Sequence, residues 1–133
     1  MAVVTNYKRD KFDISVDLEY GNKFEHHLDE VFKEGRRVEV KTERGIWKTT
    51  GNISIEIRCR EILSGLSITE AEYWIHLLAD GDIIKGGFII PVKELKVRVK
   101  EMVNNKTAEI VMGGDDNASQ LVLVPIEKLF NIK

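Results

Sequence analysis

The chain has 133 residues and a mass of 15.2 kDa, which is the size of one ordinary domain. Hydrophobic residues make up 43% of the chain and charged residues 32%, and this composition excludes a disordered or collagen-like protein. No apolar run approaches the ~18 residues that span a bilayer, and the single cysteine, Cys59, excludes an internal disulfide. We therefore expect one domain over residues 1–133, with residues 1–10 as a loose arm, in the cytoplasm and without a membrane partner.

Charge is distributed unevenly along the chain, although the net charge is only −2. Residues 33–48 hold six basic side chains against three acidic ones, and residues 93–106 hold five against two. Each segment therefore carries a local charge of +3, which could steer a polyanion to one face of the protein. Two ordinary solvated surfaces would have the same composition, so both interpretations stay open.

The first predicted elements are a strand, a helix and a β-hairpin. Residues 11–19 alternate polar and apolar side chains, which predicts a strand. Gly21 ends this alternation, and an apolar stripe at helical spacing predicts a helix over residues 23–32. Two further segments, residues 37–43 and 52–58, alternate strictly and read as strands. Glycines in the segment between them predict that they form a hairpin.

The second half of the chain predicts another helix and several strands. Thr69 is suited to cap a helix over residues 69–79, because Glu72 follows at the third helical position, as in a capping box. One or two strands are predicted over residues 83–90, and a short one over residues 109–112. The near-copies FIIPVKEL and VLVPIEKL each indicate a buried strand that runs into a helical turn at its proline. Strands interspersed with helices indicate an α/β fold with a mixed central β-sheet flanked by helices.

Charged side chains share one face of the predicted hairpin. With the simplest antiparallel pairing, Glu39 lies opposite Glu56, with Lys41 one pleat away, and like charges so placed destabilise a sheet. Because Mg²⁺ prefers one or two carboxylates with several waters, the two glutamates could hold this ion, and Lys41 could orient a metal-bound water. The pattern is equally typical of a solvated face whose carboxylates pair with Arg37, Lys41 and Arg58, so this alternative stays open.

A series of short motifs follows in order along residues 17–95: EVK, TGN, IE, SG and TEAEYW. Their order and spacing resemble the core of the PD-(D/E)XK nuclease superfamily, and its small phage-type members in particular. The resemblance implies a restriction-endonuclease-like core (helix, β-hairpin, helix, strand). It also implies a metal-dependent DNA endonuclease that uses Mg²⁺ or Mn²⁺.

The resemblance can be aligned in two ways. In one, Glu39 is the first acid and the tripeptide is Glu56-Ile57-Arg58, with arginine in place of lysine. In the other, the tripeptide is Glu39-Val40-Lys41, and no well-placed aspartate lies just upstream, with Asp17 and Asp29 as the candidates. Glu39, Lys41 and Glu56 share one face in both, so we expect these three residues to be catalytic and both glutamates to bind the metal. The leading helix of the superfamily often adds a carboxylate, which implies a supporting role for Glu25.

The partner expected from this interpretation is DNA, whose phosphates would contact the basic segment 33–48 and a helix within residues 93–106. The residues expected to contact nucleic acid are Arg36, Arg37, Arg44, Trp47 and Lys48. Trp47 could stack on a base, although packing of the hairpin loop would explain it equally well. A non-catalytic module that binds nucleic acid or a protein is the alternative function, and an RNA-directed relative is a third. Small nucleases of this type are frequently dimers, which makes a homodimer a further expectation.

Overall fold

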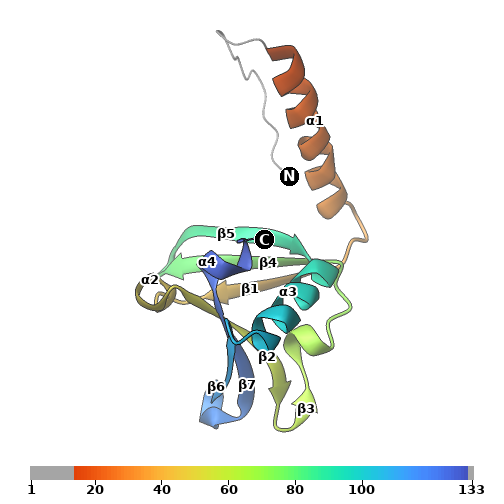
Figure 1. Cartoon of the computed structure of the whole chain (residues 1–133). Coiled ribbons are helices and arrows are strands. Elements are labelled where there is room, and N and C mark those ends of the chain that lie inside the picture. Colours follow the sequence, from red (N-terminus) through yellow and green to blue (C-terminus); the bar gives the residue numbers. More distant parts are fainter. Residues whose placement is uncertain (1–13, 132–133) are drawn as a thin grey trace. The chain divides into compact units, whose positions relative to one another are not determined.

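The computed structural model describes residues 14–131, apart from the side chains of residues 14–20, Asn22 and Glu25. The chain forms two compact units, one that ends at Arg36 and one of Arg37–Lys133. The first unit contains α1 (Ile14–Val31), and the second contains the sheets and the remaining helices (Figure 1). None of the described helices is long and apolar enough to cross a membrane.

Helix α1 is longer than the sequence predicts. The expected strand over residues 11–19 is wrong from residue 14 onward, and residues 11–13 lie outside the described part. Ile14 and Leu18 fit the four-residue spacing of a helix as well as the two-residue spacing of a strand. Gly21 lies inside α1 rather than ending a strand, at a cost of about 1 kcal/mol relative to alanine.

The first sheet contains β1 (Val38–Glu43), β4 (Tyr73–Asp80) and β5 (Ile83–Pro91), in the order β1-β4-β5. Strand β1 is parallel to β4, and β5 is antiparallel to it. The predicted helix over residues 69–79 is wrong, because β4 occupies most of this segment. The Thr69 hydroxyl accepts a hydrogen bond from the backbone N–H of Ala71 (3.2 Å), so it closes a local turn instead of capping a helix.

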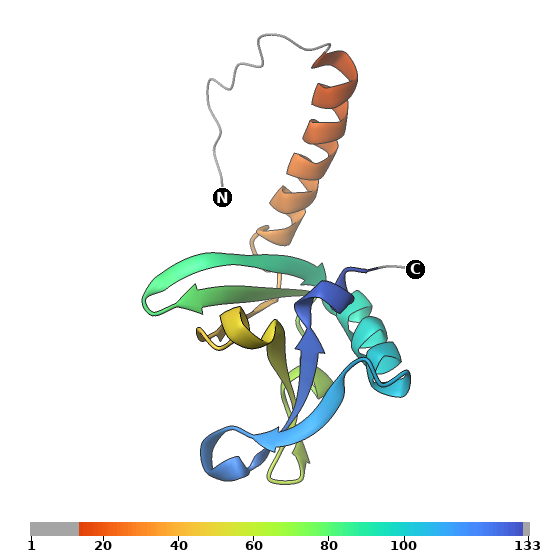
Figure 2. The ribbon, with the colours of Figure 1, turned by 60° about the vertical axis from the view of Figure 1, so that its left-hand side comes forward.

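The second sheet is antiparallel throughout. It contains β2 (Asn52–Cys59), β3 (Ile62–Leu63), β6 (Glu109–Gly113) and β7 (Ser119–Pro125), in the order β3-β2-β7-β6 (Figure 2). The predicted strand bounds of β2 and β6 are therefore confirmed within one residue. A 3₁₀ turn, η2 (Asp115–Asn117), connects β6 to β7.

The predicted hairpin between β1 and β2 is wrong, because the two strands belong to different sheets. The segment between them forms one turn of helix, α2 (Trp47–Thr50), which ends at Gly51 in the left-handed conformation (φ +72°). The indole N–H of Trp47 donates to the carbonyl of Ala79 (2.8 Å), which attaches this corner to β4. The chain therefore turns from one sheet into the other here, and the expected cross-strand pair of Glu39 and Glu56 does not form.

Both prolines stand where a strand runs into a helix, as predicted. Pro91 ends β5 and is followed by α3 (Val92–Asn104), and Pro125 ends β7 and is followed by α4 (Ile126–Leu129). Helix α3 lies beside both sheets of the second unit (Figure 1). Its buried side chains join those of both sheets in one core. The fully buried members of that core are Ile53, Ile55, Trp74, Leu95, Val122 and Val124.

Two sheets and four α-helices within residues 14–131 make the protein a mixed α/β structure. This confirms the predicted fold class at the level of α/β. The first sheet is mixed, as expected, whereas the second is a separate antiparallel sheet that the sequence analysis does not predict.

Candidate functional site

Three charged side chains of β1 leave the strand on one face. Residues that pair in parallel strands share a face, and Glu39 pairs with Trp74 while Lys41 pairs with His76. Trp74 and His76 are both 1% exposed, so this is the face that looks into the second unit. Glu43 continues the same alternation at the end of β1. The edge strand of the first sheet therefore carries a short row of charges on this face, of which Glu43 is the most buried.

Two of the predicted catalytic residues lie in contact. The ammonium nitrogen of Lys41 lies 3.0 Å from Oε1 of Glu39, and the two side chains are 45% and 35% exposed. The tripeptide Glu39-Val40-Lys41 thus holds a carboxylate and an amine next to each other on an accessible edge strand.

Glu43 forms the most buried polar contacts of this row. Its Oε1 accepts hydrogen bonds from the backbone N–H of Ser54 on β2 (2.6 Å) and from Nε2 of His76 on β4 (3.0 Å). The indole N–H of Trp74 donates to Nδ1 of His76 (3.0 Å). Because an indole can only donate, Nδ1 must accept and the proton of His76 must lie on Nε2. One carboxylate, only 12% exposed, therefore ties β1 to strands of both sheets.

Sequence reasoning missed this arrangement, because it paired the strand that holds Glu43 with residues 52–58 in a hairpin. The parallel register that brings Glu43 to His76 joins residues 33 positions apart, and no local pattern reveals such a pairing. The His76 ring also stacks on Phe88, with ring centroids 5.5 Å apart, so it is held on both sides.

Glu56 lies on β2 and is held by its own neighbours. The buried hydroxyl of Ser119 donates to its Oε1 (2.6 Å). A 3₁₀ turn, η1 (Gly65–Ser67), begins directly against its backbone, where a side chain at Gly65 would collide with the Glu56 carbonyl. The Ser-Gly pair of the sequence motif therefore serves a close approach between η1 and β2.

The carboxylates do not form a ready metal centre. Within the described residues no three histidine, cysteine, aspartate or glutamate side chains are grouped so that they could hold an ion. Glu39 pairs with Lys41, Glu43 with His76, and Glu56 with Ser119. The side chain of Glu25, the fourth residue expected in the site, lies outside the described residues. The residues that are described thus do not fit a preformed site for Mg²⁺ or Mn²⁺.

Most cations expected to contact nucleic acid are engaged within the protein. Arg36 pairs with Glu30 (2.9 Å) and Arg37 with Glu70 (3.4 Å). Arg44 is the exception, being exposed and without an ion pair among the described residues.

The corner at α2 is also occupied by internal contacts. Lys48 binds Asp80 (2.7 Å), and its ammonium group, with a smaller effect from Lys85, holds the pKa of the Asp80 carboxyl below its usual value. Trp47 is half-buried and uses its N–H on Ala79. Of the two interpretations for Trp47, packing of the loop is the one that the observed contacts support.

Cations without such partners lie along α3. Lys93, Lys96 and Lys100 are exposed and follow one another at three- and four-residue spacing, which places them on one side of the helix. None of them has a carboxylate partner within the described part of the chain. Arg98, by contrast, pairs with Glu94 (2.9 Å). We call Lys93, Lys96 and Lys100 the lysine stripe.

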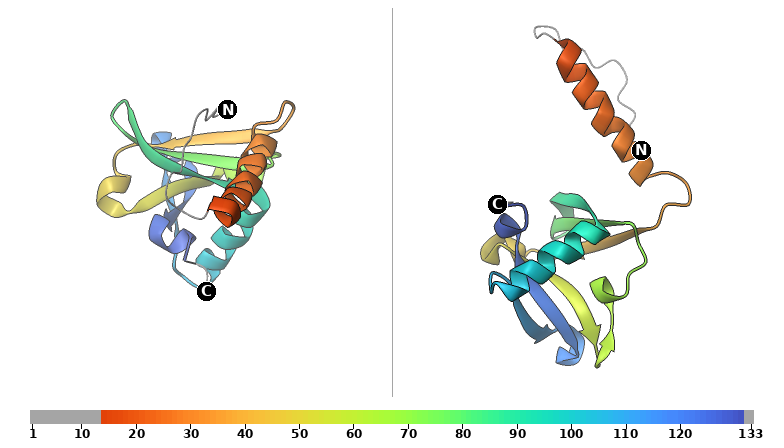
Figure 3. Two further views of the ribbon diagram at one scale, coloured as in Figure 1. Left: turned by 90° about the horizontal axis from the view of Figure 1, so that it is seen from above. Right: turned by 45° about the vertical axis from the view of Figure 1, so that its right-hand side comes forward.

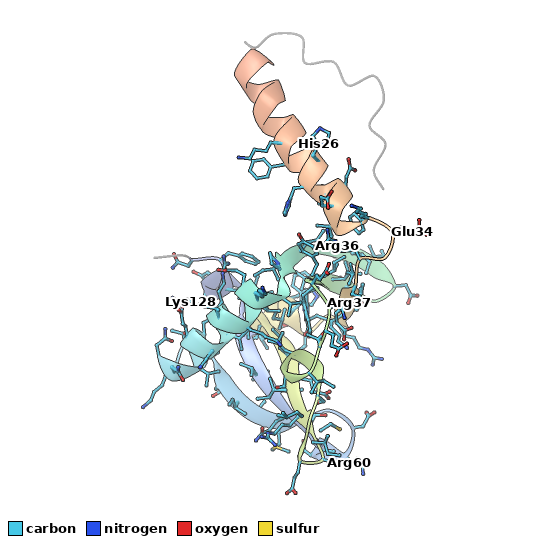
Figure 4. All side chains as sticks on the ribbon, turned by 90° about the vertical axis from the view of Figure 1, so that its right-hand side faces the viewer. His26, Glu34, Arg36, Arg37, Arg60 and Lys128 are labelled. Atoms are coloured by element: carbon cyan, nitrogen blue, oxygen red, sulfur yellow. The ribbon has the colours of Figure 1, made fainter. Side chains whose placement is uncertain are left out.

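Other exposed cations are dispersed. Arg60 lies at the tip of the β2–β3 hairpin and Lys128 lies on α4, at different ends of the second unit (Figure 4). The lysine stripe is therefore the place where unpaired positive charge is concentrated on a single regular element of this unit.

Comparison of the chain with models of protein families, with curated proteins and with solved structures finds no match.

Proposed function

We propose that this protein binds nucleic acid, and that the lysine stripe on α3 is its phosphate-contact surface. The observation that carries the proposal is the alignment of three exposed, unpaired lysines on one helix face. From Lys93 to Lys100 the helix rises about 10 Å, at 1.5 Å per residue. One strand of duplex DNA presents a phosphate about every 3.4 Å along its axis, so the stripe matches about three phosphates.

The stripe also lacks a competing structural role. The ammonium groups are not needed to neutralise buried carboxylates, and the helix is anchored by its buried residues Val92, Leu95, Val99 and Met102. Arg98, which does not belong to the stripe, donates hydrogen bonds to Glu94 and to the carbonyl of Leu129. Replacing the lysines should therefore change binding without unfolding the domain.

The test compares two double variants of the full chain that lose the same charge. Lys96→Ala/Lys100→Ala removes two of the three proposed contacts, and Arg60→Ala/Lys85→Ala removes two exposed cations elsewhere. Fluorescence anisotropy with a labelled oligonucleotide at low salt should show weaker binding for the first variant and nearly unchanged binding for the second. Equal weakening in both would mean that charge alone, rather than α3, attracts the ligand.

Metal-dependent cleavage of DNA is the second candidate function, favoured by the contact between Glu39 and Lys41. These residues stand in the order that the resemblance to the PD-(D/E)XK superfamily requires of its acidic tripeptide. The helix–hairpin–helix–strand order of that superfamily is not found here, because β1 and β2 form no hairpin and β4 takes the place of the second helix. The proposed relationship therefore rests on the motifs alone. A homodimer, with DNA between its copies, belongs to the same proposal.

Cleavage is tested with supercoiled plasmid and branched DNA in Mg²⁺ or Mn²⁺. Glu39→Gln and Lys41→Met should each abolish nicking, because both remove the charge while keeping the size of the side chain. Glu56→Ala should abolish it as well if this glutamate belongs to the site. Nicking that persists in Glu39→Gln would identify a contaminating nuclease or another site, and no nicking by the wild type would overturn the cleavage proposal.

A further inference from the structure

An apolar groove runs beside the lysine stripe. It lies between α3, η1 and the second sheet and has a volume of about 370 Å³, within the ~300–1,000 Å³ of ordinary ligand sites. Figure 3 (right) shows α3 lying across the strands of this sheet, with η1 beside it. The apolar residues that line the groove are Ile57, Leu66, Val99, Val103, Ile110 and Val122. We call this the α3 groove.

Lys96 and Lys100 belong to the lining of the α3 groove as well as to the stripe. No acidic side chain lines it; Ser67 and Asn104 are its uncharged polar members. When the negative charges of a ligand bind the lysines, the neighbouring parts of that ligand therefore lie over the aliphatic floor of the groove. Ile110, 46% exposed, forms part of that floor on β6.

The two forms of nucleic acid differ in what they can offer this groove. In a duplex the bases are paired and stacked on one another, so only their edges are accessible in the grooves, and no base face can pack on an aliphatic groove beside the lysines. In a single strand the bases can turn outward, and their flat faces leave water when they pack on apolar side chains. A cationic rim with an apolar floor thus complements a single strand better than a duplex.

We infer that the α3 groove receives the bases of single-stranded nucleic acid while the lysine stripe holds its phosphates. This inference rests on the proposed function, since it names the substrate class of the same surface. DNA and RNA strands share the required chemistry, and both serve as probes.

The experiment measures anisotropy of the full chain with three labelled probes of equal length. These are a mixed-sequence single strand, the same sequence as a duplex, and an abasic single strand that keeps only the sugar-phosphate backbone. The single strand should bind about tenfold more tightly than either other probe, the ratio that 1.4 kcal/mol of base contact produces. An RNA strand of the same sequence replaces the DNA strand in a parallel series.

Two variants separate base contacts from phosphate contacts. Ile110→Ser changes the groove at a half-exposed position. It should weaken binding of the single strand severalfold while leaving binding of the abasic probe unchanged. Val97→Ser is the matched control, because Val97 is 52% exposed on α3 and lies outside the groove lining. Circular dichroism checks that both variants retain the fold.

The outcomes distinguish this inference from the proposed function. Duplex or abasic binding that equals or exceeds single-strand binding overturns the inference but leaves a phosphate-binding surface intact. Absence of binding to all three probes overturns both. A third outcome would assign the groove to a protein partner and overturn the inference. In it, Ile110→Ser and Val97→Ser change the binding of the single strand equally, and only an acidic amphipathic peptide displaces the bound strand.

Discussion

Replacing Glu43 tests the contact that joins the two sheets. In Glu43→Ala, the backbone N–H of Ser54 and Nε2–H of His76 both lose their acceptor. A buried donor without a partner costs about 1–3 kcal/mol, so the two together should lower the free energy of unfolding by about 2–6 kcal/mol. Because a domain of this kind has about 5–15 kcal/mol in total, the loss is large enough to measure directly.

The assay is urea denaturation of the full chain, followed by tryptophan fluorescence. Glu39→Ala is the control on the same strand and face, and its exposed pair with Lys41 should cost no more than about 1 kcal/mol. Glu43→Gln keeps a carbonyl acceptor and should lose less than Glu43→Ala. Equal stability of the Glu39→Ala and Glu43→Ala proteins would refute the reasoning, because the two carboxylates would then contribute alike despite their different burial.

Two further predictions concern the turns around β2 and β4. Gly65→Ala should destabilise the fold by about 2 kcal/mol or more, since its Cβ would collide with the Glu56 backbone; Gly86→Ala, which meets open space, is the control, and thermal unfolding distinguishes them. Lys48→Met should remove the larger of the two influences that lower the pKa of Asp80, the smaller being that of Lys85. A carboxyl pKa that is lower in the folded state stabilises the fold at pH values above the pKa of the unfolded state, about 3.9. This stabilisation is lost as the pH falls through the pKa of the folded state. The wild type should therefore be more stable than Lys48→Met near neutral pH, and a difference that persists unchanged in strong acid would contradict this.

Local patterns predicted the elements whose structure depends on local physics. The alternation in residues 37–43 and 52–58 gives strands β1 and β2, and each proline marks a change from strand to helix. A proline in these positions has the same effect wherever the strand pairs, because it fixes its own backbone angle and lacks an N–H.

Pairing between strands could not be predicted in the same way. Residues 73–80 carry a capping signal upstream and apolar residues at helical spacing, yet they form the central strand between β1 and β5. Hydrogen bonds to two neighbours and the burial of Trp74 and His76 outweigh the local preference. The β1–β2 hairpin fails for the related reason that α2 and its Trp47 contact redirect the chain into another sheet.

The candidate site was predicted in parts. The neighbouring charges of Glu39 and Lys41 follow from their spacing on one strand, and this contact is present. The position of Glu56 depended on the hairpin pairing and was wrong with it. The contacts that engage Arg36, Arg37 and Lys48 involve acids up to 33 positions away, so their pairing was beyond reach of a local charge count.

Salt dependence of nucleic-acid binding tests the central claim most directly. The slope of log affinity against log salt is about −0.9 per phosphate neutralised in a duplex and about −0.7 in a single strand. Lys93→Ala/Lys96→Ala/Lys100→Ala should therefore flatten the slope by about 2 units on a single strand and by nearly 3 on a duplex. A slope that stays at its wild-type value in this variant would contradict the assignment of phosphate binding to α3.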